Sequence, residues 1–333
     1  MNILILGLGA IGQRYIRILK RLSSAYSICS LRSTSHNQLI ADDLTATTVP
    51  DLPASLGIST VSCVEKARQF NPTYIIDARP PLYHLVGIDS LIRCAKGIFC
   101  EKPLSINAQK SILLHSEVIQ SSKSKIVVGY HYVQHPLVQQ LKTLILNTKV
   151  LRYSFVYEES LRHIQPFRTP DVMHESSATT SGSVLHSLSH AVHLALFLFS
   201  SFETTYLSHS SHTPEYLGYD IYGCSDLYLL HSNDTHSFTG FVRCAFDSHR
   251  PQQIFTIYTK EITYRLDLRH NILQLWKGHE LQNAFSQPIT KIDLLSSQMS
   301  AFLNLSGPPN GQYYPLVSFD DALATLSLCD HVL

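Results

Sequence analysis

The sequence is poor in charge, and the charge it carries is balanced. It contains 26 Lys and Arg against 25 Asp and Glu, and charged residues make up 15% of the chain against 44% for hydrophobic residues. No run of Lys or Arg and no basic stripe occurs, so the electrostatic footprint of a nucleic-acid-binding protein is missing. This composition is typical of a packed globular protein rather than of a disordered chain. A chain of 333 residues is expected to divide into two domains.

Long apolar runs and export signals are also lacking. The chain runs from Met1 directly into the apolar Ile3–Leu6, without a basic segment or a small-residue cleavage site, which argues against a signal peptide. The most apolar stretch, Leu194–Phe199, is far shorter than the roughly 20 residues that cross a bilayer. The seven cysteines are scattered and never spaced as CxxC: Cys29, Cys63, Cys94, Cys100, Cys224, Cys244 and Cys329. We therefore expect a cytoplasmic protein with free thiols, no cysteine-based zinc site and no membrane partner.

The first part of the chain alternates short apolar runs with helical patterns. We expect strands at Asn2–Leu6, Ser27–Leu31, Tyr74–Ala78, Gly97–Cys100 and Ile126–Tyr130. Helices are expected at Ile11–Leu22, Val61–Phe70, Leu85–Ala95 and Ala108–Gln120, the last with Asn107 as its N-cap, and Thr34–Pro53 is expected to be a loop with one short strand. This alternation predicts an N-terminal Rossmann domain, a doubly wound parallel sheet, over residues 1–122.

The remainder, residues 123–333, has longer segments in which apolar and polar residues alternate. We expect strands at Val150–Val156, Phe238–Phe246, Ile254–Tyr258, Ile262–Leu268 and Ile272–Trp276. Glu158–Ser181 is expected to be an extended loop and Val184–Phe199 a helix with one buried face. The pattern predicts a C-terminal α+β domain with a large, mostly antiparallel open sheet, so the fold class is α/β overall.

A glycine-rich loop follows the first expected strand and opens the first expected helix. It reads GLGAIG, with Gly7, Gly9 and Gly12 as its glycines and Ala10 and Ile11 between them. In a dinucleotide-binding unit the first glycine permits the tight turn, the second lets the backbone approach a pyrophosphate, and the third lets helix and strand pack closely. The helix N-terminus would then offer N–H groups to the phosphates. The alternative is a tight turn that binds nothing.

An acidic residue is lacking where an NAD-binding unit usually carries one, at the end of the second strand. Arg32 and Ser33 stand there instead, and a guanidinium and a hydroxyl can both bond a ribose 2′-phosphate. NADP(H) is therefore the preferred cofactor, with NAD(H) possible. In the alternative interpretation Arg32 stacks on the adenine of either cofactor.

The chain resembles the glucose–fructose oxidoreductase, inositol dehydrogenase and MocA family (Gfo/Idh/MocA). The motifs that carry the resemblance run through the whole chain in the family's order: GLGAIG at 7–12, Asp77–Pro81 with His84, Cys100–Pro103, Gly129–His131, the helix Gly182–Phe199, and Ser318–Ala322. The resemblance implies that Lys102 of the Glu-Lys-Pro motif lies near the nicotinamide and moves the proton that accompanies hydride transfer. It also implies cofactor contacts at Arg79, Pro80, His84 and Glu101. By composition alone Lys102 would be an ordinary solvated lysine.

The family's second catalytic element is an aspartate one helical turn before a histidine. His190 falls on the histidine, but the aspartate position holds Ser187, which cannot act as a carboxylate. His190 is then the partner of Lys102 or a substrate anchor, and the further substrate-side candidates are Tyr130, His131, Arg168 and Ser187. His186, His190 and His193 share one helix stripe, which could hold a metal, but a polar substrate-facing or solvent-facing row is preferred and no metal is expected.

These observations predict an NADP(H)-dependent oxidoreductase that transfers hydride to or from a small polar substrate. The resemblance implies a sugar or sugar-nucleotide derivative as that substrate, and a homodimer or homotetramer formed through the second domain. Two alternatives remain open: an imine or enone reductase of a secondary-metabolite or tetrapyrrole pathway, which the missing aspartate favours, and a non-catalytic NADP-binding subunit.

Overall fold

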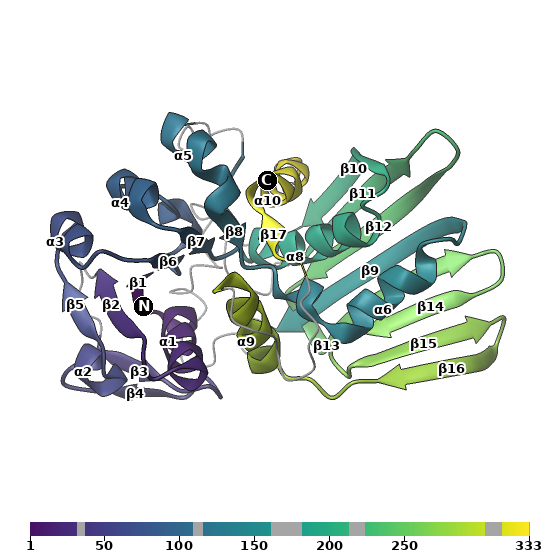
Figure 1. Cartoon of the computed structure of the whole chain (residues 1–333). Helices are drawn as coiled ribbons and strands as arrows, with labels where there is room; N and C mark the ends of the chain where they lie inside the picture. Colours follow the sequence, from purple (N-terminus) through teal and green to yellow (C-terminus); the bar gives the residue numbers. More distant parts are fainter. Residues whose placement is uncertain (32–36, 109–115, 161–181, 213–223, 304–314, 333) are drawn as a thin grey trace. The chain divides into compact units, whose positions relative to one another are not determined.

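The computed structural model describes residues 1–31, 37–108, 116–160, 182–212, 224–303 and 315–332 (Figure 1). They form two compact units. The first contains Met1–Tyr130 and Leu295–Leu323, and the second contains His131–Leu294 and Ala324–Leu333. The first unit thus includes a second segment from near the C-terminus. The predicted N-terminal domain, residues 1–122, does not include this segment.

A seven-stranded sheet forms the centre of the first unit, in the order β17-β8-β7-β6-β1-β2-β5. Six strands pair in parallel: β1 (Asn2–Leu6), β2 (Ser27–Leu31), β5 (Ser59–Val61), β6 (Tyr74–Asp77), β7 (Gly97–Cys100) and β8 (Ile126–Val128). The seventh, β17 (Val317–Ser318), joins β8 antiparallel. The four residues Ile3–Leu6 are all buried, as expected for a parallel strand covered on both faces. The predicted doubly wound sheet is confirmed.

Helices cover this sheet, and two of the predicted ones begin later than expected. The helices are α1 (Ala10–Leu22), α2 (Leu52–Leu56), α3 (Val64–Gln69), α4 (Asp89–Cys94), α5 (Glu117–Ser122), the C-terminal part of α9 (Lys291–Phe302), and the start of α10 (Phe319–Cys329). The prediction of helix from Val61 is wrong because Val61 pairs with Leu31 in β5. The prediction of helix from Leu85 is also wrong, because Leu85 has a left-handed φ of 62°.

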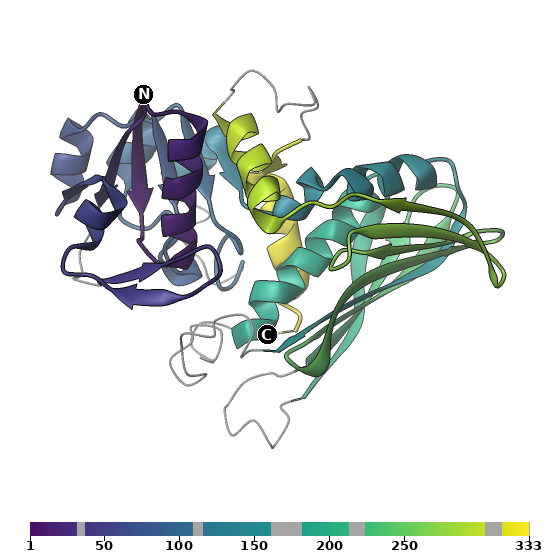
Figure 2. The same ribbon diagram turned by 90° about the horizontal axis from the view of Figure 1, so that it is seen from below.

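Two further segments differ in detail from the prediction. The described part of Thr34–Pro53 contains a hairpin of two short strands, β3 (Gln38–Ile40) and β4 (Ala46–Thr48), rather than one. Figure 2 shows this hairpin beside α1. The predicted helix Ala108–Gln120 falls partly outside the described residues. Its described end belongs to α5, which is capped by the Ser116 hydroxyl accepting from the Ile119 N–H.

An eight-stranded sheet forms the second unit, in the order β10-β11-β12-β9-β13-β14-β15-β16. The strands are β9 (Val150–Ser160), β10 (Glu203–His212), β11 (Cys224–Ser232), β12 (Ser237–Ala245), β13 (Asp247–Thr259), β14 (Thr263–Asp267), β15 (Ile272–Lys277) and β16 (Glu280–Ser286). Every neighbouring pair is antiparallel except β12 with β9. The predicted large, mostly antiparallel sheet is confirmed.

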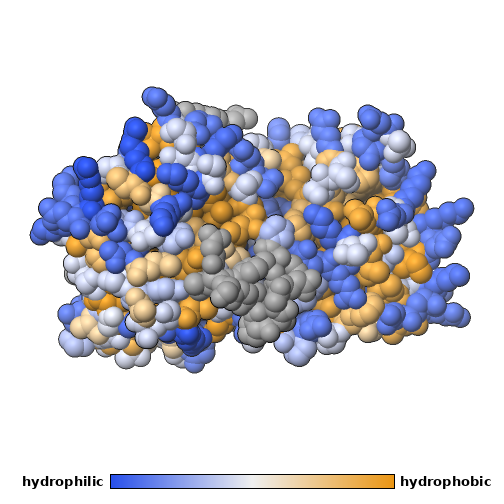
Figure 3. All heavy atoms as spheres, in the orientation of Figure 1, coloured by the Kyte–Doolittle hydropathy of each residue, from blue (hydrophilic) through white to orange (hydrophobic). Residues whose placement is uncertain are grey.

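Two helices pack on this sheet and enclose an aromatic core. The helix α8 (Gly182–Leu198) contacts β9, β11 and β12, and α6 (Pro136–Ile145) contacts β14 and β15. Tyr153 stacks on Phe255 with ring centroids 5.1 Å apart, and Phe199 meets Phe238 at 4.9 Å. A Cβ at Gly240 would lie 2.0 Å from the Tyr153 ring, so only glycine leaves room for that tyrosine. Hydrophilic residues gather at the right-hand edge of Figure 3, where Figure 1 shows the ends of strands β14, β15 and β16, and apolar residues are visible further inward.

No helix among the described residues has both the length and the apolar character needed to cross a membrane. All seven cysteines are free, and Cys29, Cys100, Cys224, Cys244 and Cys329 are buried. These five thiols fill space in the cores of the two units, as small apolar side chains do.

Candidate functional site

The glycine loop is built so that two of its glycines cannot be replaced. Gly7 follows β1 with a φ of +91°, and a Cβ on it would lie 2.8 Å from the Ala78 carbonyl oxygen. A Cβ on Gly12 would lie 2.1 Å from the Gly7 carbonyl oxygen. The turn between β1 and α1 therefore requires glycine at both positions, at the first for conformation and at both for space.

Gly9 differs from the other two because it faces open space. It has an extended conformation, with φ −70° and ψ −176°, and apart from its two chain neighbours no described residue has an atom within 4 Å of the Cβ it lacks. Gly9 is also the N-cap of α1, whose first backbone bond runs from the Gln13 N–H to the Gly9 carbonyl at 3.0 Å. The N–H groups of the first turn, from Ala10 to Gly12, thus have no partner within the helix, and no acidic residue lies in that turn. This open cradle with the positive end of a helix dipole suits a phosphate.

The segment after β6 is folded around a buried carboxylate. Asp77 is fully buried and accepts two bonds from the Arg79 guanidinium, at 2.9 and 2.7 Å, and one from the Leu85 N–H at 2.7 Å. The Arg79 side chain also donates to the Val86 carbonyl at 3.1 Å. The Arg79 guanidinium therefore fixes the turn between β6 and α4, a structural role that the sequence does not reveal.

His84 joins this turn to the Glu-Lys-Pro turn. Its ring Nδ1 lies 2.9 Å from the Pro103 carbonyl oxygen and its Nε2 lies 2.7 Å from the Arg79 carbonyl oxygen. The side chain is buried. Pro80 is the N-cap of a short 3₁₀ helix, Pro81–Tyr83. The cofactor contacts predicted for Arg79, Pro80 and His84 stay predictions, and the described contacts of His84 are with backbone carbonyls.

The Glu-Lys-Pro turn lies at the end of β7 and is buried. Glu101 accepts a hydrogen bond from the Tyr15 hydroxyl of α1 at one oxygen and from the Lys102 N–H, at 3.1 Å, at the other. A Cβ on Gly129 would lie 3.1 Å from the Glu101 carboxylate, so the small residue makes room for it. Burial and the neighbouring Glu101 raise the pKa of Tyr15 well above its usual value, so Tyr15 stays protonated and donates.

Lys102 itself is only 7% exposed, so the interpretation as a solvated lysine is wrong. Cys100, two residues before it, is buried, and burial together with the charges of Asp77 and Glu101 raises the pKa of its thiol. That thiol therefore stays protonated and is a poor nucleophile.

In the second unit, two of the predicted substrate-side residues lie together. The His131 and His190 rings meet edge to face with centroids 4.9 Å apart, and Tyr132 lies 4.5 Å from the first and 5.1 Å from the second. The Tyr132 hydroxyl donates to Gln253 at 2.8 Å, and Gln253 in turn donates to Glu159 at 2.7 Å. Burial raises the pKa of Tyr132 above its usual value. His190 thus has a tyrosine and a histidine as ring neighbours.

The sequence prediction missed Tyr132 and Gln253, although the run Gly129–Tyr132 with its two aromatic residues beside His131 was a signal for the tyrosine. Ser187, one turn before His190, is buried, and so are His190 and His193, which excludes a solvent-facing row at those two positions. Tyr130 is buried at the end of the first unit. No group of His, Cys, Asp and Glu able to hold a metal occurs among the described residues.

The predictions for Arg32, Ser33 and Arg168 fall outside the described residues, as does the side chain of His186. The remaining site residues divide between the units. Gly7, Gly9, Ala10, Ile11, Gly12, Arg79, Pro80, His84, Glu101, Lys102 and Tyr130 belong to the first, and His131, Ser187 and His190 to the second.

The sequence matches no protein-family model, and no curated protein sequence matches it. Solved structures do match. An oxidoreductase from Sinorhizobium meliloti superimposes with a TM-score of 0.75 at 15% identity, covering 99% of this chain and 95% of that one. UDP-N-acetylglucosamine 3-dehydrogenase from Acidithiobacillus ferrooxidans gives 0.72 at 13% identity, covering 100% and 97%. Biliverdin reductase from Synechocystis sp. PCC 6803, solved with biliverdin and NADP+, gives 0.71 at 12% identity, covering 99% and 96%. The chain has the fold of the Gfo/Idh/MocA-type oxidoreductases.

Proposed function

We propose that this chain is an NADP(H)-dependent oxidoreductase that transfers hydride to or from a small polar substrate. The observation that carries the proposal is the open cradle at Gly9. Two neighbouring glycines, Gly7 and Gly12, are packed so tightly that a Cβ would strike backbone, whereas the space beside Gly9 is open among the described residues. A turn that bound nothing would gain stability from a side chain that filled this space and capped the helix.

The first unit would hold the dinucleotide. The N–H groups at the start of α1 would bind its diphosphate, and the two turns that His84 joins would form the wall next to its reactive end. A nicotinamide cofactor supplies the hydride when it is bound, and the protein supplies orientation and proton transfer. The preference for NADP(H) over NAD(H) is proposed from Arg32 and Ser33, the residues that stand where a carboxylate would otherwise exclude a 2′-phosphate.

Lys102 is proposed as the residue that moves the accompanying proton at its Nζ atom. Its turn is fixed on one side by the Tyr15–Glu101 bond and on the other by the His84–Pro103 contact. A buried lysine on such a frame can be held within hydrogen-bond reach of a reacting oxygen or nitrogen. His190 is proposed as the substrate-side partner, with His131, Ser187, Tyr130 and Arg168 as further substrate contacts.

The proposed substrate is a sugar or sugar-nucleotide derivative, which is what the matched UDP-N-acetylglucosamine 3-dehydrogenase acts on. An imine or enone reductase is the second candidate. Ser187 in place of a carboxylate favours it, because a protonated imine needs less acid assistance than a ketone, and the matched biliverdin reductase has the same fold. A non-catalytic NADP-binding subunit is the third candidate.

Calorimetric titration with NADPH and NADH, followed by turnover at the nicotinamide absorbance band, separates these functions. We expect NADPH to bind more tightly than NADH, and nucleotide-linked sugars to be turned over in preference to imines and enones. Turnover of imines or enones alone would favour the second candidate, and NADPH binding without any turnover the third. If neither nucleotide binds, the oxidoreductase proposal fails.

We also propose that the chain forms a homodimer or homotetramer through the sheet of the second unit. Tyr228 is 42% exposed, and Phe241, opposite it on β12, is half-buried on the same face of the sheet. Such a pair can belong to the contiguous apolar patch that an interface requires. Light scattering on the eluting protein would measure the mass, and a monomer at all concentrations would contradict the proposal. The predicted cytoplasmic location stays a prediction.

A further inference from the structure

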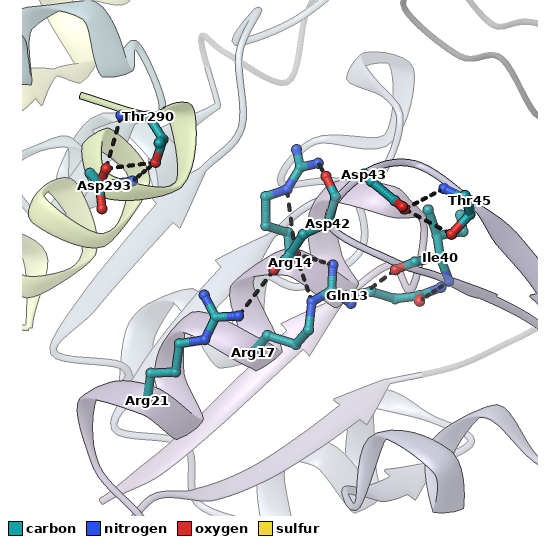
Figure 4. Close-up of polar contacts among 10 residues, drawn as sticks. All are labelled: Gln13, Arg14, Arg17, Arg21, Ile40, Asp42, Asp43, Thr45, Thr290 and Asp293. Atoms are coloured by element: carbon teal, nitrogen blue, oxygen red, sulfur yellow. Dashed lines mark hydrogen bonds and ion pairs between the residues drawn. The ribbon is translucent and has the colours of Figure 1, made fainter. Parts of the chain in front are cut away.

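Gln13 occupies an unusual place in the first unit. It lies in the first turns of α1, directly after the last glycine of the loop, and is fully buried. Its amide nitrogen donates to the Leu8 carbonyl at 2.9 Å and to the Gln38 carbonyl at 2.8 Å. Its amide oxygen accepts from the Ile40 N–H at 2.8 Å. One side chain thus bonds both the glycine loop and strand β3 of the neighbouring hairpin. Figure 4 shows the bond between Gln13 and Ile40 of β3.

The bond to Leu8 has a consequence for the next residue. The Leu8 carbonyl and the Gly9 N–H belong to one planar trans peptide unit, in which they point in opposite directions. By holding the Leu8 carbonyl toward itself, Gln13 turns the Gly9 N–H away from the α1 side chains and from the hairpin. Gly9 is the residue that faces open space.

The other contacts between α1 and the hairpin do not reach the glycine loop. Arg17 donates to the Ile40 carbonyl at 2.9 Å and to the Asp42 carboxylate at 2.8 Å, and Arg21 pairs with the same carboxylate at 3.0 Å. Figure 4 shows these arginines converging on Asp42 along one side of α1. Several side chains therefore hold the hairpin on α1. Among those named here, Gln13 is the one that also bonds the glycine loop, at the Leu8 carbonyl.

We propose that Gln13 is a positioning residue for the dinucleotide, which sets the orientation of the Leu8–Gly9 peptide so that the Gly9 N–H faces the diphosphate. The inference rests on the proposed function, since it presupposes that the loop binds a diphosphate. The inference adds Gln13 to the proposed nucleotide site as a residue whose side chain bonds the backbone of the glycine loop and does not touch the dinucleotide itself.

The test compares two variants in which a long side chain of α1 becomes methionine. Gln13→Met removes the bonds to Leu8 and to the hairpin, whereas Arg17→Met removes bonds to the hairpin and leaves Leu8 untouched. We expect Gln13→Met to weaken NADPH binding by about tenfold or more, the size of effect that a misaligned charge-assisted bond produces, and Arg17→Met to change it by less than about threefold. Adenosine 2′-monophosphate, which lacks a diphosphate, should bind both variants as it binds the parent protein.

The outcomes separate the inference from the function it rests on. If the parent protein binds NADPH and Gln13→Met binds it equally well, or if both variants lose affinity alike, the inference is overturned and the proposed function stands. An equal loss for NADPH and for adenosine 2′-monophosphate would also overturn it. If the parent protein binds neither nucleotide, the proposed function itself has failed. Should Gln13→Met not fold, as judged by its thermal transition, Gln13→Asn keeps the amide but shortens it, and the same NADPH comparison applies.

Discussion

Polar side chains in the two units have different kinds of hydrogen-bond partner. In the first unit such side chains bond mainly to the backbone: Gln13 to three main-chain groups, His84 to two carbonyls, and Glu101 to the N–H of the next residue. These bonds fix the path of three turns. The second unit contains bonds between side chains instead, as at the buried His231, whose ring lies between the Tyr153 and Thr204 hydroxyls, and in the half-buried chain from Tyr132 through Gln253 to Glu159.

This difference indicates which of the two units can change its polar residues without changing its backbone. A turn set by side-chain bonds to the backbone presents main-chain groups in fixed places, which suits a ligand that is the same in many enzymes, such as a dinucleotide. A network of side chains can change residue by residue while the strands that carry it stay in register. We therefore expect substitutions in the first unit to act on nucleotide binding and substitutions in the second unit on substrate choice and on the titration of buried groups.

The largest effect is expected for Lys102. Lys102→Met removes the proposed proton donor and acceptor while keeping an unbranched side chain, and general acid–base groups contribute about 10²–10⁴-fold to a rate. We expect kcat to fall by about that factor while the Kd for NADPH changes little. Single-turnover kinetics at the nicotinamide band measure the first and calorimetry the second. A rate within about threefold of the parent protein would remove Lys102 from the mechanism.

The next effect concerns the packing of the glycine loop. Gly12→Ala places a Cβ 2.1 Å from the Gly7 carbonyl, so the backbone must shift. Overpacking of this kind costs about 1–3 kcal/mol of the free energy of unfolding, and the displaced N–H groups should weaken NADPH binding as well. Gly9→Ala is the matched control for stability, because the added Cβ would meet no atom of the described residues beyond its chain neighbours, and it should reduce nucleotide binding without loss of stability. Equal denaturation midpoints for Gly12→Ala and the parent protein would contradict the packing.

The second unit should lose stability in acid through its buried His231. Burial lowers the pKa of His231 from about 6.5 to about 4, since its ring lies between the Tyr153 and Thr204 hydroxyls inside the aromatic core. Because the unfolded chain takes up the proton first, stability is lost as pH falls from about 6.5 to about 4 and changes no further from this group below that. At about 1.36 kcal/mol for each pKa unit the loss approaches roughly 3 kcal/mol.

Urea unfolding of the parent protein and of His231→Gln across this pH range measures that contribution as a difference. The variant is expected to start less stable at pH 7 and to lose less on acidification. Parallel stability curves for the two proteins would show that His231 does not titrate in this way.

The last effect concerns the junction of α1 with the Glu-Lys-Pro turn. Tyr15→Phe removes the donor to the buried Glu101 carboxylate, at a cost of about 1–3 kcal/mol in the free energy of unfolding. The double variant with Glu101→Gln should lose less than the sum of the single losses, because the two residues share one interaction. Strict additivity in urea denaturation would mean that the bond contributes nothing.

The sequence predicted the central parallel strands well and the edge strands of both sheets poorly, for a physical reason. Strands β1 and β7 have the predicted bounds because a strand buried in a parallel sheet is a continuous apolar run. Strand β2 also has the predicted bounds, although two of its five residues are serines. The edge strand β16 was missed because six of its seven residues are exposed, so it shows no alternation. The edge strand β10, the strand β11 beside it and helix α6 were also missed.

The parts of the candidate site that consist of short contiguous motifs could be predicted from the sequence. The glycine loop and the Glu-Lys-Pro turn could be found in this way, since each is contiguous and has a fixed spacing. The Tyr132–Gln253 bond joins residues 121 positions apart, and nothing local in either segment indicates it. The Gln13 bonds to Gln38 and Ile40 were hidden for the same reason, because they depend on a hairpin that the sequence showed only as a loop with one strand.

The central claim is that the backbone amides at the start of α1 bind a diphosphate. A crystal structure of the protein grown with NADPH tests it most directly. The account predicts the diphosphate against the N–H groups of Gly9, Ala10 and Ile11, with the nicotinamide end toward Lys102. Clear density for NADPH at any other place, with the amides of this loop in contact with solvent alone, would contradict it.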